Sequence, residues 1–241
     1  MNTVSPLPRL IYKMVHVDNV EYILSTGICS SNHPLASDHY VNIGDTGLIE
    51  RRATMTVPCD PESVLTDYIP FYFCGKSLML ASIIHADENR RRFFDKGLPE
   101  RLLTFDPRRI RQYSQKDLIF ITCDVKTIVE RCPVWCFTDG HPHHPQTQFY
   151  TSLEDMDKLR WSVIDKYPEV MTEDIRRCRQ AEFLVRDYVP VDCIRSFYVR
   201  TDDVRKRIEK LVQEKLADPK YVPVTTDYHY PFLFFHNKGL D

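Results

Sequence analysis

Glycine is scarce in this chain, where it accounts for only 7 of 241 residues. The sequence contains none of the Gly-rich phosphate loops that mark nucleotide-binding folds, which argues against a Rossmann or P-loop protein. It also lacks the Gly-x-Ser-x-Gly motif of α/β-hydrolases and the His-Glu-x-x-His motif of zinc proteases. Any catalysis must therefore depend on scattered polar residues at the ends of strands.

Long apolar stretches are absent as well. No run approaches the ~20 residues that are needed to span a bilayer. The segment from Met1 to Arg9 does not have the apolar centre of a signal peptide. We therefore expect a cytoplasmic protein whose eight cysteines are reduced thiols rather than a disulfide framework.

The net charge of −2 gives the protein no overall field that would attract nucleic acid. Binding to phosphates would have to use local clusters of arginine. Such clusters occur at Arg51-Arg52, at Arg90 to Arg92, at Arg108-Arg109 with Arg111, and at Arg176-Arg177 with Arg179. Taken alone, each of them is more typical of a solvated part of the surface.

The hydrophobic content of 43% is sufficient for a substantial core, and its periodicity predicts both strands and helices. Strands are predicted at Leu10–His16, Asp67–Phe73, Asp117–Cys123, Glu182–Val185, Cys193–Val199 and Tyr221–Thr225. Helices are predicted from Asp18 to a stop at Gly27, and at Asp124–Arg131, Leu153–Tyr167, Thr172–Arg179 and Thr201–Leu216. Ser77–Ile84 is predicted to be an apolar helix or another buried segment. We expect a single α+β domain over residues 1–241 with a largely antiparallel sheet.

Three further segments have a less regular pattern. Cys29 to Asp45 is rich in loop-forming residues and is long enough to cover a ligand. Ile49 to Val57 is predicted to be a short helix that runs into a strand. Residues 85–116 are polar and charged, which indicates an inserted excursion from the fold.

A single carboxylate, Glu182, stands where a charged helical run gives way to the apolar run from Phe183 to Val185. If that run is a strand, Glu182 begins it and can point into a cleft at the edge of the sheet. The alternative is a solvated glutamate at the end of a helix. His16 lies at a comparable strand-to-helix corner, where side chains are accessible to ligands, or where a histidine can simply bind nearby backbone.

The segment from Cys132 to Pro145 is rich in residues of the types that bind zinc. These residues are Cys132, Cys136, His141, His143 and His144. Their spacing matches no common zinc pattern, and three prolines favour a rigid loop. We therefore expect no metal site.

Several short motifs are individually weak but specific in their order and spacing. They are Ile11-Tyr12 with His16-Val-Asp-Asn19 and Gly27, Ile49-Glu-Arg-Arg52 with Val57-Pro58, Asp67-Tyr-Ile-Pro-Phe-Tyr-Phe73 with Met79-Leu80, Phe137-Thr-Asp139, Gln180-Ala-Glu-Phe-Leu-Val185, and Thr226-Asp-Tyr-His-Tyr230. Together they resemble the motifs of the DarT toxins, a family of DNA ADP-ribosyltransferases, from Ile11 to about Tyr230.

The resemblance implies a mixed sheet of the ADP-ribosyltransferase type, NAD as a substrate, single-stranded DNA as the acceptor, and no metal. It implies that Glu182 and Arg52 are catalytic. The residues expected to bind NAD are His16, Asp18, Asn19, Gly27, Tyr40 and Arg52. The residues expected to bind the nucleic acid are Arg51, Lys76, Gln146 and Gln148. It further implies a monomeric toxin whose partner is an antitoxin with an ADP-ribosyl-hydrolysing macrodomain.

The sequence departs from the family pattern at a few positions. The family often has His at the position of Lys13, a different sequence between Cys74 and Met79, and a functional His where this chain has Gln146. These differences bear on the DNA sequence and the base that are modified, for which thymine is favoured and guanine is next. The alternatives are a nucleic-acid-binding module without catalysis, a metal-dependent nuclease, and a transferase that acts on RNA or protein.

Overall fold

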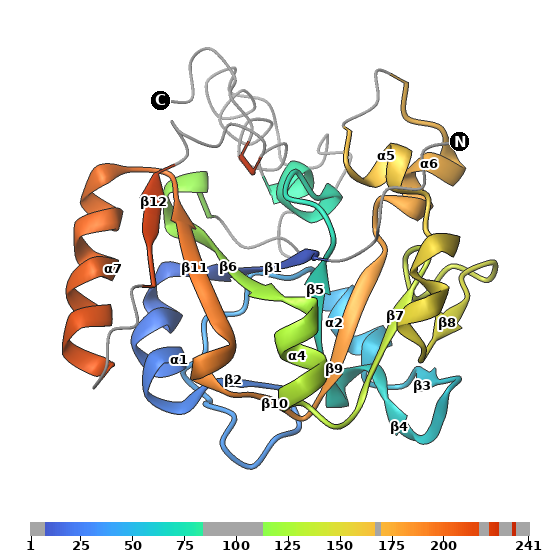
Figure 1. The fold of residues 1–241 in the computed structure, drawn as a ribbon, viewed down its shortest axis with the longest axis horizontal. Helices are drawn as coiled ribbons and strands as arrows, with labels where there is room; N and C mark the ends of the chain where they lie inside the picture. Colours follow the sequence, from blue (N-terminus) through green and yellow to red (C-terminus); the bar gives the residue numbers. More distant parts are fainter. Residues whose placement is uncertain (1–7, 84–112, 167–169, 217–221, 227–232, 235–241) are drawn as a thin grey trace, which may run out of the picture.

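An eight-stranded sheet forms the centre of the computed structural model, which describes residues 8–83, 113–166, 170–216, 222–226 and 233–234 (Figure 1). Its strands, in spatial order, are β12 (Val224–Thr226), β11 (Ile194–Val199), β6 (Leu118–Asp124), β1 (Leu10–His16), β5 (Tyr68–Tyr72), β9 (Glu182–Arg186), β7 (Trp135–Thr138) and β8 (Phe149–Tyr150). Neighbouring strands are antiparallel except β11 and β12, which are parallel. The prediction of an α+β fold with a mainly antiparallel sheet is confirmed.

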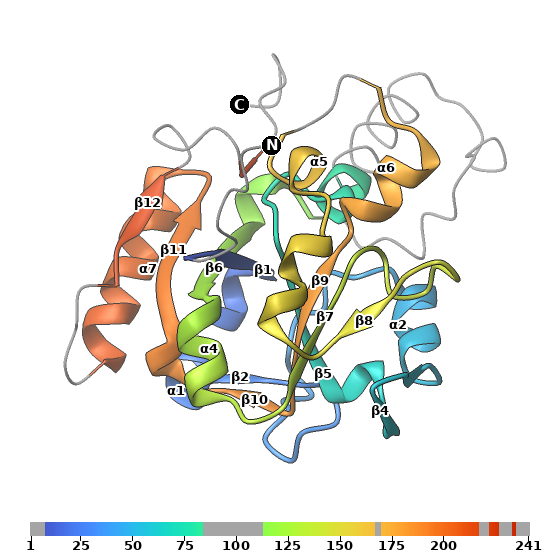
Figure 2. The ribbon, with the colours of Figure 1, turned by 45° about the vertical axis from the view of Figure 1, so that its right-hand side comes forward.

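Helices surround this sheet. They are α1 (Val20–Thr26), α2 (Thr46–Arg52), α4 (Val125–Arg131), α5 (Trp161–Ile164), α6 (Glu173–Cys178) and α7 (Asp202–Lys215), with short 3-10 turns at Val17–Asn19, Leu65–Asp67, Gln115–Asp117, Leu153–Lys158 and Val191–Cys193. Two small ladders pair β2 (Ile28–Cys29) with β10 (Tyr188–Val189), and β3 (Thr56–Val57) with β4 (Asp60–Val64). Helices α1 and α7 lie side by side, while α5 and α6 lie at one end of β9 and the β3–β4 hairpin at the other (Figures 1 and 2).

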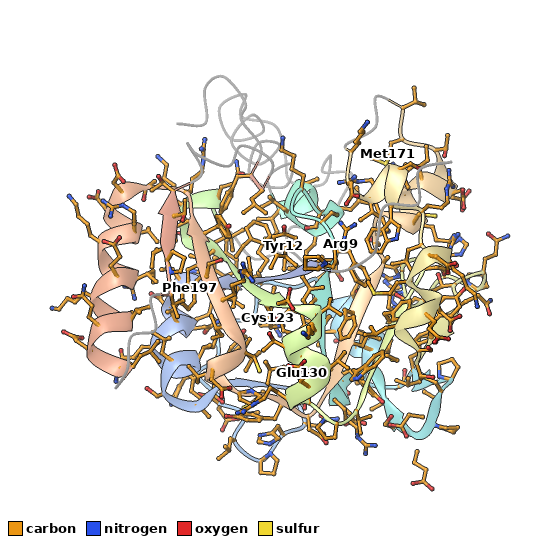
Figure 3. The ribbon with its side chains drawn as sticks, in the orientation of Figure 1. Arg9, Tyr12, Cys123, Glu130, Met171 and Phe197 are labelled. Atoms are coloured by element: carbon orange, nitrogen blue, oxygen red, sulfur yellow. The ribbon has the colours of Figure 1, made fainter. Side chains whose placement is uncertain are left out.

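Both faces of the sheet are covered, which explains the continuous apolar run in β6. The strand alternates between one face, with Ile119 and Ile121, and the other, with Leu118 and Phe120, and all four side chains are fully buried. The first face packs into one large core against α1, α4 and α7. Phe197 of β11, labelled in Figure 3, belongs to that core.

The second face carries two separate apolar clusters instead of one. The first cluster contains Met14, Leu118, Phe120 and Phe234, and the second contains Val57, Leu65 and Leu184. The gap between these clusters lies over β1, β5 and β9. Glu182 shares its face of β9 with Leu184, because alternate residues of a strand point to the same side.

Most predicted elements are confirmed, but three details are wrong. Trp135–Thr138 was expected to lie in a rigid loop and instead forms β7, because it pairs with β9. The helix predicted from Asp18 is instead preceded by the 3-10 turn Val17–Asn19, which His16 caps, since its Nδ1 accepts a hydrogen bond from the Asp18 N–H. The helix predicted at Leu153–Tyr167 breaks into a 3-10 segment and the short α5. The excursion predicted at residues 85–116 lies mostly outside the described residues.

Candidate active site

A cavity opens where strands β1 and β5 separate. The two strands pair only at Tyr12 and Tyr72, whereas β1 pairs with β6 and β5 with β9 along their whole lengths. Tyr12 is labelled in Figure 3 near the middle of the sheet. Beyond this point the facing strand edges line a cavity of about 490 Å³, which lies between the two clusters of the second face. Pro70, which has no N–H to leave unpaired, lies on the open edge of β5.

The cavity walls come from segments that are distant in the sequence. One wall is the loop between β2 and α2, represented by Ser30, Tyr40 and Asp45. A second is the helical segment of residues 78–83, and a third is the loop that carries His141 and His143. The loop from Cys29 to Asp45 therefore covers the cavity, as the sequence indicated.

An ion pair between Arg52 and Glu182 lies in this cavity. Arg52 ends helix α2 and Glu182 begins β9, and the two side chains are 14% and 4% exposed. Arg52 Nη1 lies 2.9 Å from Glu182 Oε2 and 3.3 Å from Oε1, so one guanidinium nitrogen serves both carboxylate oxygens. The second nitrogen, Nη2, is buried and has no hydrogen-bond partner within the described residues. A buried donor without a partner is costly and indicates a place for a ligand.

The backbone of Glu182 is fixed by Thr138 of β7. The Glu182 N–H donates to Thr138 Oγ1 at 3.0 Å, and the same hydroxyl donates to the Gly140 carbonyl at 2.7 Å. The adjacent loop is held by Arg177, whose Nη1 donates to Asp139 Oδ1 at 3.1 Å. Gly140 packs so closely against Arg177 that a Cβ at this position would lie 2.7 Å from the guanidinium. These contacts fix the start of β9 and the histidine loop to each other.

His141 and His143 are the imidazoles that reach the cavity. Burial lowers the pKa of both rings, and the charge of the nearby Arg52 acts in the same direction while that of Glu182 opposes it. For His143 the backbone of Arg51 also opposes the shift in pKa. Both ring nitrogens of His143 are buried without a hydrogen bond of ordinary geometry among the described residues. The neutral form of these histidines is therefore favoured next to the ion pair.

A family model described as "ssDNA thymidine ADP-ribosyltransferase, DarT" matches residues 12–97 and 102–230. The chain belongs to the DarT family. Curated relatives are a DNA ADP-ribosyl transferase of Escherichia coli O127:H6, 26% identical with 89% of this chain and 91% of the relative covered, and one of Thermus sp., 27% identical with 89% and 92% covered. The recognition and the enzyme class expected from the sequence are thus confirmed at the level of the family.

Solved DarT structures have the same fold. The Thermus sp. 2.9 DarT in complex with ADP-ribosylated ssDNA gives a TM-score of 0.77 at 24% identity, covering 98% of this chain and 100% of that one. The Thermosipho africanus DarTG in complex with ADP-ribose gives a TM-score of 0.65 at 24% identity, covering 95% of this chain and 52% of that one. Among the described helices of this DarT-family chain, none has the length and hydrophobicity to cross a membrane.

Of the residues expected to bind NAD in this DarT-family chain, Tyr40 and Arg52 line the cavity. Asn19 does not: its amide Nδ2 donates to the Val41 carbonyl at 2.9 Å, and its Oδ1 accepts from the Val41 N–H at 2.8 Å. Asn19 thereby fastens the loop that covers the cavity to the start of α1. Its effect on a ligand would be exerted through that loop.

The other three expected NAD residues also lie outside the cavity lining. His16 caps a helical turn and packs beside Tyr113, with ring centroids 4.8 Å apart. Asp18 pairs with Arg207 of α7 at 2.8 Å. Gly27 ends α1 with a φ of 95°, and a Cβ there would lie 2.5 Å from the Tyr188 ring, so only glycine fits this position.

The residues expected to contact nucleic acid lie around the cavity rather than in it. Arg51 is exposed on α2, next to Arg52. Gln146 and Gln148 are exposed in the segment that follows the histidine loop. The backbone carbonyl of Lys76 accepts a hydrogen bond from Arg179 at 3.0 Å. The structure brings Tyr40, Arg52 and Glu182 together in the cavity. The residues expected to contact nucleic acid lie at its periphery.

Sequence reasoning assigned no role in the proposed chemistry to several residues in or beside the cavity. Thr138 lies within the Phe137-Thr-Asp139 motif, so its position in a matched motif was an available signal. His141 and His143 were considered only as metal ligands. Tyr72 also lines the cavity, where burial and the nearby Glu182 raise its pKa. No simple sequence pattern distinguishes it from the other aromatic residues of its strand.

The zinc-type residues of the Cys132–Pro145 segment are directed to different places. Cys132 lies against Cys193, Cys136 faces Cys59, and the histidines reach the cavity. Across the described residues, no three His, Cys, Asp or Glu side chains gather as a metal site would require. All eight cysteines are free thiols.

Lys13 of β1 places a second cation next to the ion pair. It lines the cavity, and its Nζ lies 6.0 Å from the centroid of the Phe71 ring. Burial lowers the pKa of Lys13 to about 8, and Arg52 adds to this while Glu182 opposes it. The folded state therefore binds this proton less tightly than the unfolded chain does, and the charged lysine costs stability at neutral pH.

We predict that Lys13→Met raises the free energy of unfolding at neutral pH. The difference from wild type should shrink as pH rises from about 8 towards 10.5, because there the unfolded chain still holds the proton that the folded protein has lost. Urea denaturation at a series of pH values measures this. Lys126→Met, at a lysine that is 73% exposed, is the control and should show no such pH dependence. A destabilised Lys13→Met protein at neutral pH would contradict the prediction.

Proposed function

We propose that this protein is an NAD-dependent ADP-ribosyltransferase that modifies a base in single-stranded DNA and releases nicotinamide. The observation that carries the proposal is the Arg52–Glu182 pair in a cavity, where one guanidinium nitrogen has no partner among the residues that the structure describes. The cavity volume of about 490 Å³ falls within the range of ~300–1,000 Å³ that is usual for small-molecule and cofactor sites. Thermus sp. 2.9 DarT has been solved in complex with NAD+, which supports the same substrate here.

Glu182 is assigned to the ribose. Breaking the bond between nicotinamide and ribose builds positive charge on the sugar, and a fixed carboxylate stabilises that charge. Glu182 suits this role because its side chain is only 4% exposed and its backbone is anchored by Thr138. A carboxylate that is already oriented needs little rearrangement as the charge develops.

Arg52 is assigned to the acceptor. Its Nη1 holds Glu182, while the unpartnered Nη2 can donate to the edge of a base or to a phosphate. The attacking nitrogen of the base forms the new bond to the ribose carbon as the bond to nicotinamide breaks, and nicotinamide leaves as the neutral molecule. In this step the base loses the proton of that nitrogen to solvent. A guanidinium beside the base stabilises the negative charge that this loss creates.

We predict that Glu182→Gln binds NAD but loses at least ~10²–10³-fold in turnover, since it removes a preorganised charge. Arg52→Ala should also bind NAD, and it should lose DNA modification because the acceptor is no longer held. Arg52→Lys should recover little of the DNA modification that Arg52→Ala loses, since an ammonium lacks the planar fork that can bind Glu182 and the acceptor together. Calorimetry of NAD binding and the mass shift of an oligonucleotide measure the two effects.

Arg51→Ala is the matched control, because Arg51 neighbours Arg52 on α2 but is exposed. It should weaken DNA binding modestly and leave NAD binding unchanged. If Arg51→Ala loses transfer while Arg52→Ala retains it, the assignment of the acceptor residue is wrong. A folded Glu182→Gln protein with wild-type turnover would overturn the assignment of Glu182.

The acceptor is expected to be single-stranded, since chemistry on a base edge requires an unpaired base. We favour thymine and place guanine second, in line with the description of the family model. Two single-stranded oligonucleotides are compared, one with a single thymine and one with a single guanine, in which all other bases are adenine or cytosine. After incubation with NAD, the mass shift should appear faster in the thymine strand. Equal modification of a blunt duplex, or a preference for the guanine strand, would contradict this prediction.

We further infer that the protein acts as a toxin on DNA in the cytoplasm and is opposed by a macrodomain antitoxin. The similarity to the Thermosipho africanus DarTG, solved with ADP-ribose, supports this part of the proposal. Its expression should arrest growth in a way that depends on Glu182 and is relieved by a macrodomain that removes ADP-ribose from DNA. Growth arrest by a folded Glu182→Gln protein would count against it.

A further inference from the structure

Arg179 is a buried arginine three residues before Glu182, and the proposed chemistry gives it no part. It is only 3% exposed, although arginine is rarely buried to this extent. Burying a guanidinium is costly unless its N–H groups are bound. The contacts of Arg179 therefore indicate what the fold gains from it.

One side of the guanidinium binds the end of helix α5. Nη1 donates to the carbonyls of Val163 at 2.7 Å, Ile164 at 3.3 Å and Lys166 at 3.0 Å. The last carbonyls of a helix have no partner within the helix and carry partial negative charge. Arg179 thus supplies both the donors and the positive charge that this helix end requires.

The other side binds the segment that follows β5. Nη2 donates to the Lys76 carbonyl at 3.0 Å and lies 3.7 Å from Cys74 Sγ, and the Cys74 thiol approaches the Arg179 carbonyl at 3.6 Å. This segment leads directly into the helical residues 78–83. Met79 and Ile83 of that helix line the cavity, and Tyr72 donates to Met79 Sδ at 3.6 Å.

The backbone of Arg179 connects both contacts to the reactive residues. Arg179 caps the C-terminal end of α6, where its N–H donates to the Ile175 carbonyl at 3.0 Å. The next residues turn into β9, and Gln180 and Glu182 both line the cavity. A single guanidinium therefore joins the turn that presents Glu182 to the wall that faces it.

We propose that Arg179 is a positioning residue of the transfer reaction, which fixes Glu182 relative to the cavity wall at residues 78–83. The proposal rests on the proposed function, in which Glu182 acts at the ribose. A displacement of about 1 Å in a reacting group can cost ~10²-fold in rate, so a modest loosening of this junction would be visible in turnover. Lysine cannot replace Arg179, because one ammonium does not reach acceptors on two sides.

The test compares Arg179→Lys with Arg176→Lys, the same substitution at an exposed arginine of the same helix. We expect Arg179→Lys to bind NAD within about threefold of wild type and to lose about 30- to 100-fold in nicotinamide release. Arg176→Lys should match wild type in both. Arg179→Ala should recover part of its turnover when guanidinium is added well below denaturing concentration, and not when ammonium is added.

Hydrogen exchange provides a readout that does not depend on the reaction. Amides at Cys74–Ser77 and Val163–Lys166 should exchange faster in Arg179→Lys than in Arg176→Lys. If wild type releases no nicotinamide, the proposed function fails, while this exchange pattern still reports on the junction. Wild-type turnover by Arg179→Lys, equal losses of NAD binding and turnover, or no recovery with guanidinium would each overturn the positioning role.

Discussion

The buried ion pair between Arg52 and Glu182 is the interaction on which this site depends. The two residues are 130 positions apart in the sequence, and their close approach requires α2 and β9 to be fixed in space. Burying two charges is expensive, and removing one partner from such a pair typically costs about 3–5 kcal/mol because the other is left uncompensated. The separation of β1 from β5 provides the space for the pair, and Thr138 fixes the backbone of Glu182.

The hydrogen-bonding groups of the Arg52–Glu182 pair are not all used, which is more typical of a reaction centre than of a structural contact. A structural arginine–carboxylate pair usually uses two parallel hydrogen bonds. Here one nitrogen of Arg52 serves both oxygens of Glu182, and the other has no partner within the described residues. The charged Lys13 beside the pair adds a further cost to the folded state. Such costs are common where a substrate completes the network.

The sequence predicted the elements better than the residues that hold the site together. The local change from a helical run to an apolar strand singled out Glu182 as a candidate, and the resemblance of Gln180–Val185 to the DarT motif gave it the expected catalytic role. The roles of Asn19 and Arg179 could not be found in this way, because their partners, Val41 and the Val163–Lys166 carbonyls, are backbone groups brought near by the tertiary fold. Strand β7 was missed because its pairing with β9, rather than its own pattern, defines it.

A double-mutant comparison of DNA modification by Arg52→Ala, Glu182→Gln and the combined variant tests most directly whether the pair works as one unit. Residues that act in the same step are strongly non-additive. We expect the combined variant to lose no more activity than Glu182→Gln alone, with NAD binding retained in all three proteins. Losses that multiply would mean that Arg52 and Glu182 act independently, and would contradict a shared reaction centre.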